Sequence, residues 1–256
     1  MPIALRSATL SSCVAFAVIA ASTALITGCV TTTSAPDPKM LAERYQQAIA
    51  SPLRTEQDRR MDASRKPAEF LPFTQVAPGM QVLDVAAGGG YTSQLLALVV
   101  GPTGKLYAQR EQPSPALTKR LEDNPQPNFV LVYRPFEDPV PPDAPPLDLI
   151  TLVLNYHDIS YLPVDRAKMN ARLFAALKSG GRFVVVDHSA LPGTGISAGR
   201  TLHRIEEAFV VTEIRQAGFV LDGQGAFLKN PADTRDVTSN NPPVPTDKFA
   251  LRFVKP

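Results

Sequence analysis

Short apolar runs and amphipathic stretches alternate along most of the chain, and turn residues separate them. Runs rich in Val, Leu, Ile and Phe predict strands, which lie at 80–83, 105–109, 128–133, 147–154, 183–186, 219–221, 226–228 and 249–254. Apolar residues at helical spacing predict helices at 94–98, 115–123, 164–177 and 201–214. The run 147–154 is almost continuously apolar, which is typical of a central parallel strand covered on both faces. The pattern therefore predicts an α/β domain.

The segment before the first strand is polar and charged, and its few apolar positions predict helices that pack over the front of the domain. Pro52 restricts the residue before it and ends the first of these helices. The charge-rich stretch 54–66 is interpreted as a solvated helix face rather than a binding patch. A further helix starts at Pro67, because proline is favoured in a first helical turn, and ends before Pro78.

The strongest local signal is the glycine turn within 82–93, Val-Leu-Asp-Val-Ala-Ala-Gly-Gly-Gly-Tyr-Thr-Ser. A strand leads into Asp84, small residues follow, and a helical pattern begins after them. Such a strand–turn–helix unit holds a nucleotide-like ligand over a helix N-terminus, where the first backbone N–H groups lack partners. Gly88 and Gly90 allow a sharp bend and the close approach of a ligand. A packing turn in an unrelated α/β protein is the alternative interpretation.

The spacing Asp-x-Ala-x-Gly-x-Gly, from Asp84 to Gly90, resembles the first motif of class I S-adenosylmethionine (SAM) dependent methyltransferases. The turn Leu-Lys-Ser-Gly-Gly-Arg-Phe at 177–183 is a second resemblance to that family. The resemblance covers about residues 67–256. It implies a three-layer, Rossmann-like α/β fold with added N-terminal helices. Its seven-stranded sheet would be mostly parallel, with the last strand antiparallel.

The resemblance also implies where SAM would bind. Small residues pass under its methionine part and Asp84 holds its amino group, while Ala86 stands where the family commonly has a glycine. An acid at the end of the second strand would pair with the ribose, and Glu111 lies close to that place. Phe136 with Glu137 or Asp138 could hold the adenine, although a loop of solvated acids is the alternative. The implied cofactor-binding residues are Asp84, Ala86, Gly88, Gly90, Tyr91, Glu111, Phe136, Glu137 and Asn155.

All three histidines lie near predicted strand ends. His157 and His188 follow the fourth and fifth strands, and His203 begins the next predicted helix. Because ligands bind beyond the carboxyl ends of parallel strands, we expect the three side chains at the rim of one site. In one hypothesis His157 or His188, oriented by Asp158 or Asp187, is a general base for a substrate O or N. The candidate catalytic residues are His157, Asp158, His188 and His203.

In a competing hypothesis two or three of the histidines, with Asp158, Asp187 or Glu207, bind a divalent metal ion, because imidazole and carboxylate suit zinc, iron or nickel. His203 and Glu207 are four residues apart and would share a helix face. This alternative site comprises His157, His188, His203 and Glu207. For each histidine taken singly, a hydrogen-bonded structural role is a further alternative.

The N-terminus resembles a bacterial lipoprotein signal. A short apolar run, too short for a comfortable membrane span, precedes the lipobox-like Ile26-Thr27-Gly28-Cys29. The predicted organisation is a signal peptide at 1–28, a tether at 29–39 and a methyltransferase-like domain at 40–256. Lipid on Cys29 would hold the chain at the membrane, and by resemblance Val30 favours the periplasmic side of the outer membrane. A plain transmembrane anchor and a wrongly placed start are the alternatives.

The 256 residues carry a formal net charge of +2, so charge gives no reason to expect nucleic-acid binding. Segments such as Arg65-Lys66-Pro67-Ala68-Glu69 and Asn155-Tyr156-His157-Asp158 resemble a bacterial group of predicted methyltransferases. We therefore expect a lipid-anchored, SAM-dependent methyltransferase that acts on a small molecule or an envelope component. The alternative is a non-catalytic or metal-binding envelope protein on a methyltransferase scaffold, because SAM is made in the cytosol whereas a lipobox implies export.

Overall fold

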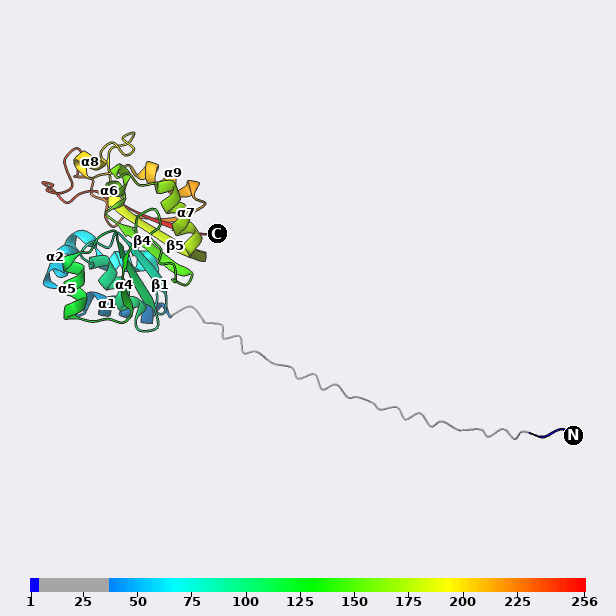
Figure 1. The fold of residues 1–256 in the computed structure, drawn as a ribbon. Helices are drawn as coiled ribbons and strands as arrows, with labels where there is room; N and C mark the ends of the chain where they lie inside the picture. The colour runs from blue at the N-terminus through cyan, green and yellow to red at the C-terminus, as the bar shows by residue number, and fades with distance from the viewer. Residues whose placement is uncertain (5–36) are drawn as a thin grey trace. The chain divides into compact units, whose positions relative to one another are not determined.

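Seven strands of the described residues form a sheet in the order β3-β2-β1-β4-β5-β7-β6 (Figure 1). Neighbouring strands run parallel, except that β7 is antiparallel to both β5 and β6. Their bounds are β1 Gln81–Val85, β2 Lys105–Arg110, β3 Phe129–Tyr133, β4 Leu147–Val153, β5 Leu177–His188, β6 Val220–Gly225 and β7 Lys248–Val254. The prediction of a mostly parallel seven-stranded sheet with its last strand antiparallel is confirmed.

The computed structural model describes residues 1–4 and 37–256. The lipobox with Cys29, most of the predicted tether and nearly all of the predicted signal peptide lie outside the described residues. The helices and strands all belong to one compact unit, Pro36–Pro256. Among the described residues, no helix has the length and apolar character needed to cross a membrane.

Nine helices within 37–256 cover the two faces of the sheet. Their bounds are α1 Pro38–Ala50, α2 Glu56–Arg65, α3 Pro67–Thr74, α4 Tyr91–Val100, α5 Pro115–Asp123, α6 Tyr156–Tyr161, α7 Arg166–Ala176, α8 Gly199–Leu202 and α9 Glu207–Gln216. Helices α1, α3, α4 and α5 contribute buried residues to one apolar core. Helices α6, α7 and α9 contribute to the second. The result is the predicted three-layer arrangement with additional N-terminal helices.

Strand β1 shows why the central strands are apolar along their whole length. Val82 belongs to one core and Leu83 and Val85 belong to the other, because successive side chains of a strand point to opposite faces. All three side chains are fully buried. A strand between two helical layers therefore needs apolar residues on both faces, which explains the continuous runs in the sequence.

Local signals set the ends of the N-terminal helices. Thr55 caps α2 in a capping box: its Oγ1 accepts the Asp58 N–H at 3.1 Å, and Asp58 Oδ2 accepts the Thr55 N–H at 2.8 Å. Helix α2 ends at Lys66, whose backbone is left-handed (φ 50°). Pro67 then starts α3, as predicted. The left-handed residue Lys66 thus separates α2 from α3.

Three predicted elements differ from the structure. Strand β5 continues back through the predicted glycine turn, because Gly180 N–H donates to Lys255 O and Lys255 N–H donates to Gly181 O, at 2.8 and 3.0 Å. The predicted helix over 201–214 is instead two helices, α8 and α9. Segment 226–228 is not a strand, and β6 ends before it.

The break between α8 and α9 has a clear cause. His203 has a left-handed backbone (φ 51°) and ends α8 rather than beginning a helix. Ile205 then pairs with the end of β5, where its N–H donates to His188 O at 3.0 Å and Ala190 N–H donates to Ile205 O at 2.9 Å. Backbone pairing with the sheet thus takes the place of helix continuation at this point.

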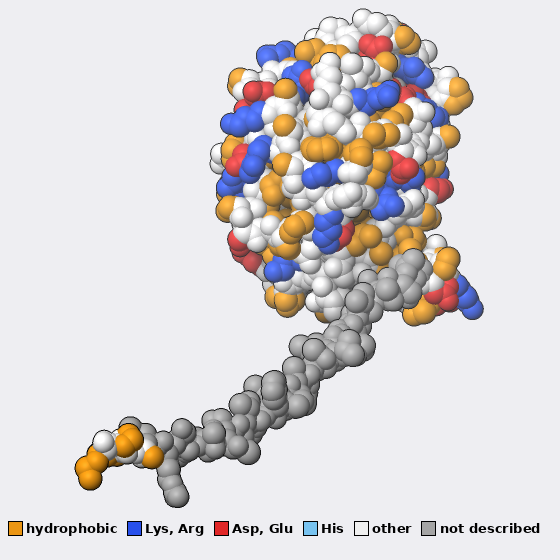
Figure 2. Space-filling view, turned by 90° about the vertical axis from the view of Figure 1, so that its right-hand side faces the viewer, with side chains coloured by type: hydrophobic (Ala, Val, Ile, Leu, Met, Phe, Trp, Pro, Cys, Tyr) orange, Lys and Arg blue, Asp and Glu red, His pale blue; other side chains and the backbone are white. Residues whose placement is uncertain are grey.

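Charged side chains of both signs are mixed on the visible face of the molecule (Figure 2). Lys and Arg are interspersed with Asp, Glu and apolar side chains, and no patch of one charge covers this face. This mixture agrees with the near-balanced formal charge of +2.

Candidate active site

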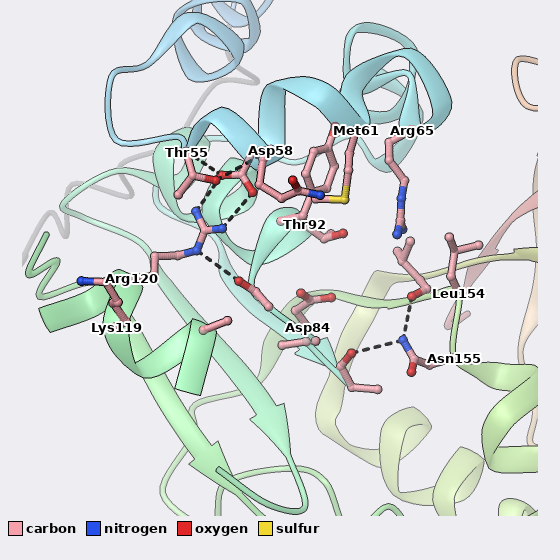
Figure 3. A pocket seen from close by; sticks show the side chains of 18 of the residues that line it. Thr55, Asp58, Met61, Arg65, Asp84, Thr92, Lys119, Arg120, Leu154 and Asn155 are labelled. Atoms are coloured by element: carbon pink, nitrogen blue, oxygen red, sulfur yellow. Dashed lines mark hydrogen bonds and ion pairs between the residues drawn. The ribbon is translucent and has the colours of Figure 1, made fainter. Parts of the chain in front are cut away.

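A cavity of about 440 Å³ lies at the carboxyl ends of β1 and β4, beside α2 and α5 (Figure 3). Its size is in the range of small-molecule sites, and its position is the one expected for a ligand in an open α/β sheet. The residues that shape it are the turn Ala86 to Gly89, Thr55 to Arg65 from the α2 segment, Ala116 to Asp123 from α5, and Val153 to Asn155 after β4.

The turn below the cavity has an unusual backbone. Ala86, Gly88 and Gly90 are left-handed, with φ of 55°, 57° and 88°. A Cβ added at Gly90 would lie 2.6 Å from Leu117 Cδ1, so both the packing of α5 and the φ of 88° favour glycine there. A Cβ at Gly88 would have no neighbour nearer than Ala86 O at 4.0 Å, which leaves open space over this cavity-lining residue.

Ala86 is the one alanine in this series of left-handed residues. Its N–H donates to Gln109 Oε1 at 3.0 Å, and the next N–H, of Ala87, donates to Gln109 O at 2.9 Å. Gln109 is fully buried and its Nε2 donates to Arg134 O. The buried glutamine at the end of β2 therefore holds the strained residue in place.

Asp84 is buried beneath the turn, with 2% of its surface exposed. Its carboxylate accepts hydrogen bonds from Ser93 Oγ at 2.5 Å and Thr151 Oγ1 at 2.7 Å. Burial raises the pKa of Asp84 to about 6, and the two hydroxyl groups limit the rise. Burying an unpaired carboxylate costs free energy, so the ionised Asp84 favours a cationic partner in the cavity.

Helix α2 closes the cavity through a buried ion pair. Arg120 of α5 donates from Nη1 and Nη2 to the two oxygens of Asp58, both at 2.8 Å, and from Nε to Gly89 O at 3.2 Å. The Asp58 side chain is 1% exposed. The interpretation of 54–66 as a solvated face is therefore wrong for the side that faces the glycine turn.

A second buried group links α2 to the first residue of α4. Tyr91 Oη donates to Asp62 Oδ1 at 2.7 Å, and Arg54 pairs with the same Asp62. The Arg54 guanidinium also lies 5.4 Å from the centre of the Tyr91 ring, at a distance typical of a cation–π contact. Tyr91, a predicted cofactor residue, lines the cavity and is held by these contacts.

Arg65 supplies a cation that the sequence analysis did not single out for the cavity. Figure 3 shows its side chain reaching from α2 toward Leu154 and Asn155. Burial lowers its pKa, while the nearby Tyr91 and Asp187 oppose this effect. In the sequence Arg65 belongs to a charged stretch that predicts a solvent-facing helix. Only the packing of α2 on the glycine turn shows that its side chain points into the cavity.

The residues predicted for ribose and adenine do not line the cavity. Strand β2 ends at Arg110, so Glu111 does follow the strand directly, but its Oε1 accepts the N–H of Phe136 at 3.2 Å. Glu137 is likewise absent from the cavity lining. Arg110 instead donates to Gly88 O at 3.0 Å. The structure therefore groups Asp84, Ala86, Gly88, Tyr91 and Asn155 at the cavity, whereas Gly90 packs against α5 and Glu111, Phe136 and Glu137 lie apart.

Asn155 joins the cavity to the histidines. Its Nδ2 donates to Ala86 O at 3.3 Å and to Val153 O at 3.0 Å (Figure 3). It also precedes α6, whose second residue is His157. A single turn of chain therefore connects the glycine turn with the predicted catalytic residues.

The three histidines do cluster, as predicted. The His157 ring centre lies 5.9 Å from that of His188 and 5.6 Å from that of His203. His157 Nδ1 lies 2.6 Å from Oδ1 of fully buried Asp187, and its Nε2 lies 3.2 Å from Asp158 Oδ1. His203 Nδ1 is also 3.2 Å from that Asp158 oxygen.

The charges around His157 and His188 are opposite. Burial alone would lower the pKa of His157, but the negative charge and hydrogen bonds of Asp187 and Asp158 raise it to about 10. For His188, burial and the nearby cations Lys248, His157, Arg65 and Arg204 lower the pKa to about 2. Both ring nitrogens of His157 face carboxylates, so this arrangement leaves no free lone pair for a general base on His157.

The proposed partnership of His203 with Glu207 is wrong. The helix that would have joined them is broken, and Glu207 accepts hydrogen bonds from Lys229 Nζ at 2.8 Å and from Gln224 Nε2 at 3.0 Å. His188 Nδ1 lies 2.8 Å from Thr246 Oγ1. The side chains that converge are instead His157, Asp158 and His203, whose ligand atoms all lie within 4.8 Å of one another.

Comparison with known proteins supports the fold. A model of the protein-L-isoaspartate(D-aspartate) O-methyltransferase family matches residues 37–120, about a third of the chain. This segment spans α1 to α5 and includes the glycine turn. No curated protein matches the chain.

Solved structures extend the likeness over most of the chain. A SAM dependent methyltransferase from Aquifex aeolicus has 17% identity and a TM-score of 0.57, with 87% of this chain and 100% of that chain covered. A putative methyltransferase from Bacillus halodurans has 19% identity and a TM-score of 0.53, with 74% and 98% covered. An arsenic(III) SAM methyltransferase from Chlamydomonas reinhardtii has 14% identity and a TM-score of 0.54, with 86% and 74% covered. The chain therefore has the fold of class I methyltransferases.

Proposed function

We propose that this chain is a SAM-dependent class I methyltransferase that acts on a small molecule or an envelope component. The observation that carries the proposal is the cavity of about 440 Å³ built on the left-handed turn after β1, directly above buried Asp84. The family match over 37–120 covers this turn and both bordering helices. The fold supports the same reaction class.

The residues of the cavity suit the amino-acid end of SAM best. Asp84 offers negative charge to an ammonium group, Gly88 leaves room for close approach, and Asn155 fixes the turn through Ala86 O. Met61 and Ala116 add apolar surface farther along the cavity. Roles for Glu111, Phe136 and Glu137 in holding ribose and adenine stay predictions, since these side chains lie outside the cavity.

SAM, when bound, supplies an activated methyl group, and the chain's own residues position and shield it. The Asp58–Arg120 pair holds α2 against the turn and keeps water from that side. Asn155 and the start of α6 lie next to the glycine turn, and we expect the acceptor to bind on this side. In methyl transfer much of the rate enhancement comes from such positioning.

The surroundings of His157 and His188 make neither imidazole an effective general base. His188 is uncharged at neutral pH and only its Nδ1 has a polar neighbour, the Thr246 hydroxyl, among the described side chains. Its low pKa makes it a weak base. We therefore expect the pH profile of kcat/KM, measured with an identified acceptor, to show no histidine ionisation near pH 6.5. His188→Gln should leave the shape of this profile unchanged.

The proposal is tested by titrating SAM into the purified full-length chain by calorimetry. Wild type should bind one equivalent, and Asp84→Asn should bind at least about tenfold more weakly, because it loses the charge but not the size of the side chain. Asp148→Asn is the matched control: Asp148 is a partly buried acid of β4 that pairs with Lys178 and Gln81 N–H, outside the cavity. Absence of binding in wild type, or equal loss in both variants, would contradict the proposal.

The acceptor can be sought with SAM labelled on its methyl carbon. Incubation with fractionated envelope extract should transfer label in wild type and not in Asp84→Asn. Label in a low-molecular-mass fraction would identify a small molecule, and label in a lipid, glycan or protein fraction would identify an envelope component. No transfer to any fraction despite SAM binding would favour a non-catalytic role.

We further propose that lipid on Cys29 anchors the chain at the bacterial envelope. The support is the lipobox-like Ile26-Thr27-Gly28-Cys29 in the sequence. Cys29→Ser should move the chain from the membrane fraction to a soluble fraction or leave it unprocessed, as seen by fractionation and mass spectrometry. An unchanged N-terminus and membrane association in the variant would contradict this anchor.

The second candidate, a metal-binding envelope protein on this scaffold, is favoured by the convergence of His157, Asp158 and His203. Metal binding and SAM binding are not exclusive, because these residues lie outside the lining of the cavity.

A further inference from the structure

We propose that His157, Asp158 and His203 form a binding site for one divalent transition-metal ion. The ligands come from two segments that lie 46 positions apart in the sequence, the start of α6 and the end of α8. The site is separate from the cofactor cavity and does not depend on SAM.

The spacing of the three ligand atoms suits a metal. Asp158 Oδ1 lies 3.2 Å from His157 Nε2 and 3.2 Å from His203 Nδ1. Two ligands bound at about 2.1 Å with an angle of about 100° are about 3.2 Å apart, between tetrahedral and octahedral geometry. All three atoms lie within 4.8 Å of one another. The two pairs that include Asp158 Oδ1 therefore have the separation expected for ligands of one ion.

The surroundings of His157 orient it as a ligand. Asp187 Oδ1 lies 2.6 Å from His157 Nδ1, while Asp187 Oδ2 accepts the His157 N–H at 2.8 Å. The Asp187 side chain is fully buried and the His157 side chain is 5% exposed. Metal-ligating histidines usually donate their other N–H to such a carboxylate. The buried nitrogen Nε2 is thus directed at the Asp158–His203 group, and an ion bound there would take the place of the proton that Nε2 shares with Asp158.

The other two ligands are also held in position. Tyr161 Oη donates to Asp158 Oδ1 at 2.8 Å. His203 adopts a left-handed backbone with φ 51°, an arrangement that is unfavourable for a non-glycine residue. Ser239 Oγ donates to His203 O at 3.0 Å and supports this conformation. The strained backbone aims the His203 ring at the group.

The donor set narrows the class of metal. Two imidazole nitrogens and one carboxylate oxygen suit zinc, iron, nickel or manganese better than calcium or magnesium. Three protein ligands leave at least one coordination position for water or for an oxygen of a small molecule. Neither His188, which faces Thr246, nor Glu207, which faces Lys229, belongs to the set.

The same distances also fit two hydrogen bonds from histidines to Asp158, so the test must separate a metal site from a hydrogen-bonded cluster. The purified full-length chain, with any affinity tag removed, is treated with a chelator and dialysed into metal-free buffer. Zinc is titrated by calorimetry, and cobalt(II) is titrated by absorbance because its visible bands report coordination number. The variants are Asp158→Asn and His203→Gln, with His188→Gln as the matched control from the same histidine cluster.

Wild type and His188→Gln should bind one zinc ion with equal affinity and show the same cobalt bands. His203→Gln and Asp158→Asn should bind zinc at least about tenfold more weakly. The cysteines Cys13 and Cys29 are present in every variant, so they cannot produce this difference. Urea unfolding of each apo variant checks the fold, and His203→Gln replaces a side chain that is already 28% exposed.

Equal zinc affinity in wild type and both ligand variants would overturn the proposal, as would an equal loss in His188→Gln. No binding in wild type would do the same and would leave a hydrogen-bonded cluster. The titration contains no SAM, so a chain that binds zinc but not SAM would contradict the proposed function and still support this site.

Discussion

At the scale of single residues, Asp84 trades stability for function. The pKa of Asp84 is 3.8 in the unfolded chain and about 6 in the folded chain. The folded protein therefore loses stability as the pH rises from 4 to 6, because the buried carboxyl group becomes charged. The loss is about 3 kcal/mol above pH 6. Asp84→Asn lacks this loss and should be more stable than wild type at pH 7 by about 1–3 kcal/mol, while binding SAM more weakly.

Urea unfolding of wild type and Asp84→Asn at pH 4, 5, 6 and 7 measures this effect. The difference between the two proteins should grow with pH and level off above pH 6. A constant difference across the series would show that the Asp84 carboxyl ionises normally in the folded chain. The carboxylate would then carry no cost of burial for a bound SAM ammonium group to offset.

Ala86 offers a second test at the same scale. Its φ of 55° costs an alanine about 1 kcal/mol relative to glycine. Ala86→Gly should therefore raise the free energy of unfolding by about 0.5–1 kcal/mol and leave SAM binding intact. The control is Ala87→Gly, next in the chain and without a positive φ, which should lower stability by about 0.5–1 kcal/mol. Equal effects of the two changes on urea unfolding would show that the backbone at Ala86 is not strained.

At the scale of elements, the buried pair Asp58–Arg120 joins α2 to α5. Arg120→Met leaves the carboxylate of Asp58 without its charged partner, and this should cost about 3–5 kcal/mol in free energy of unfolding. The double variant Asp58→Asn with Arg120→Met should recover more than half of that loss, because the isolated charge is gone. Urea unfolding of both variants checks this, and a loss below about 1 kcal/mol in Arg120→Met would mean that α2 is not held by the pair.

Also at this scale, the elements show where local patterns are decisive and where they are not. Pro67 and the glycine turn are local signals, and the structure has each element where they predict it. The predicted helix over 201–214 fails because Ile205 pairs with the backbone of β5. That pairing depends on a partner far away in the sequence, so helical spacing alone could not reveal it.

At the scale of the whole molecule, Arg204 connects the sheet to the long C-terminal loop. Its fully buried guanidinium donates to Asp233 at 2.8 and 3.1 Å, to Val237 O at 2.8 Å and to Ser189 O at 3.0 Å. Arg204→Met should cost about 3–5 kcal/mol and release the loop 229–247. Limited trypsin digestion should then cut at Arg235 in the variant. Arg200→Met, an exposed neighbour in α8, is the control, and equal protection of both variants would contradict the role of Arg204.

The parallel sheet explains why the candidate site could be located before its contacts were known. Asp84, Asn155 and Asp187 follow or end strands β1, β4 and β5, and neighbouring parallel strands bring their carboxyl ends to one edge. The clustering of the three histidines follows from the same rule. The partner of each histidine depends on side-chain packing. His157 faces Asp187 and Asp158, whereas His188 faces the hydroxyl group of Thr246.

The layered α/β fold, the glycine turn over Asp84 and the edge of the sheet that carries the site could all be predicted from the order of residues along the chain. These features follow from periodicity and backbone preference, which act over a few residues. Three features became visible only in the folded chain: α2 covers the cavity through Asp58, Glu111 lies outside it, and His203 joins His157 rather than Glu207. Those outcomes depend on contacts between distant segments, where burial and charge pairing outweigh the local pattern.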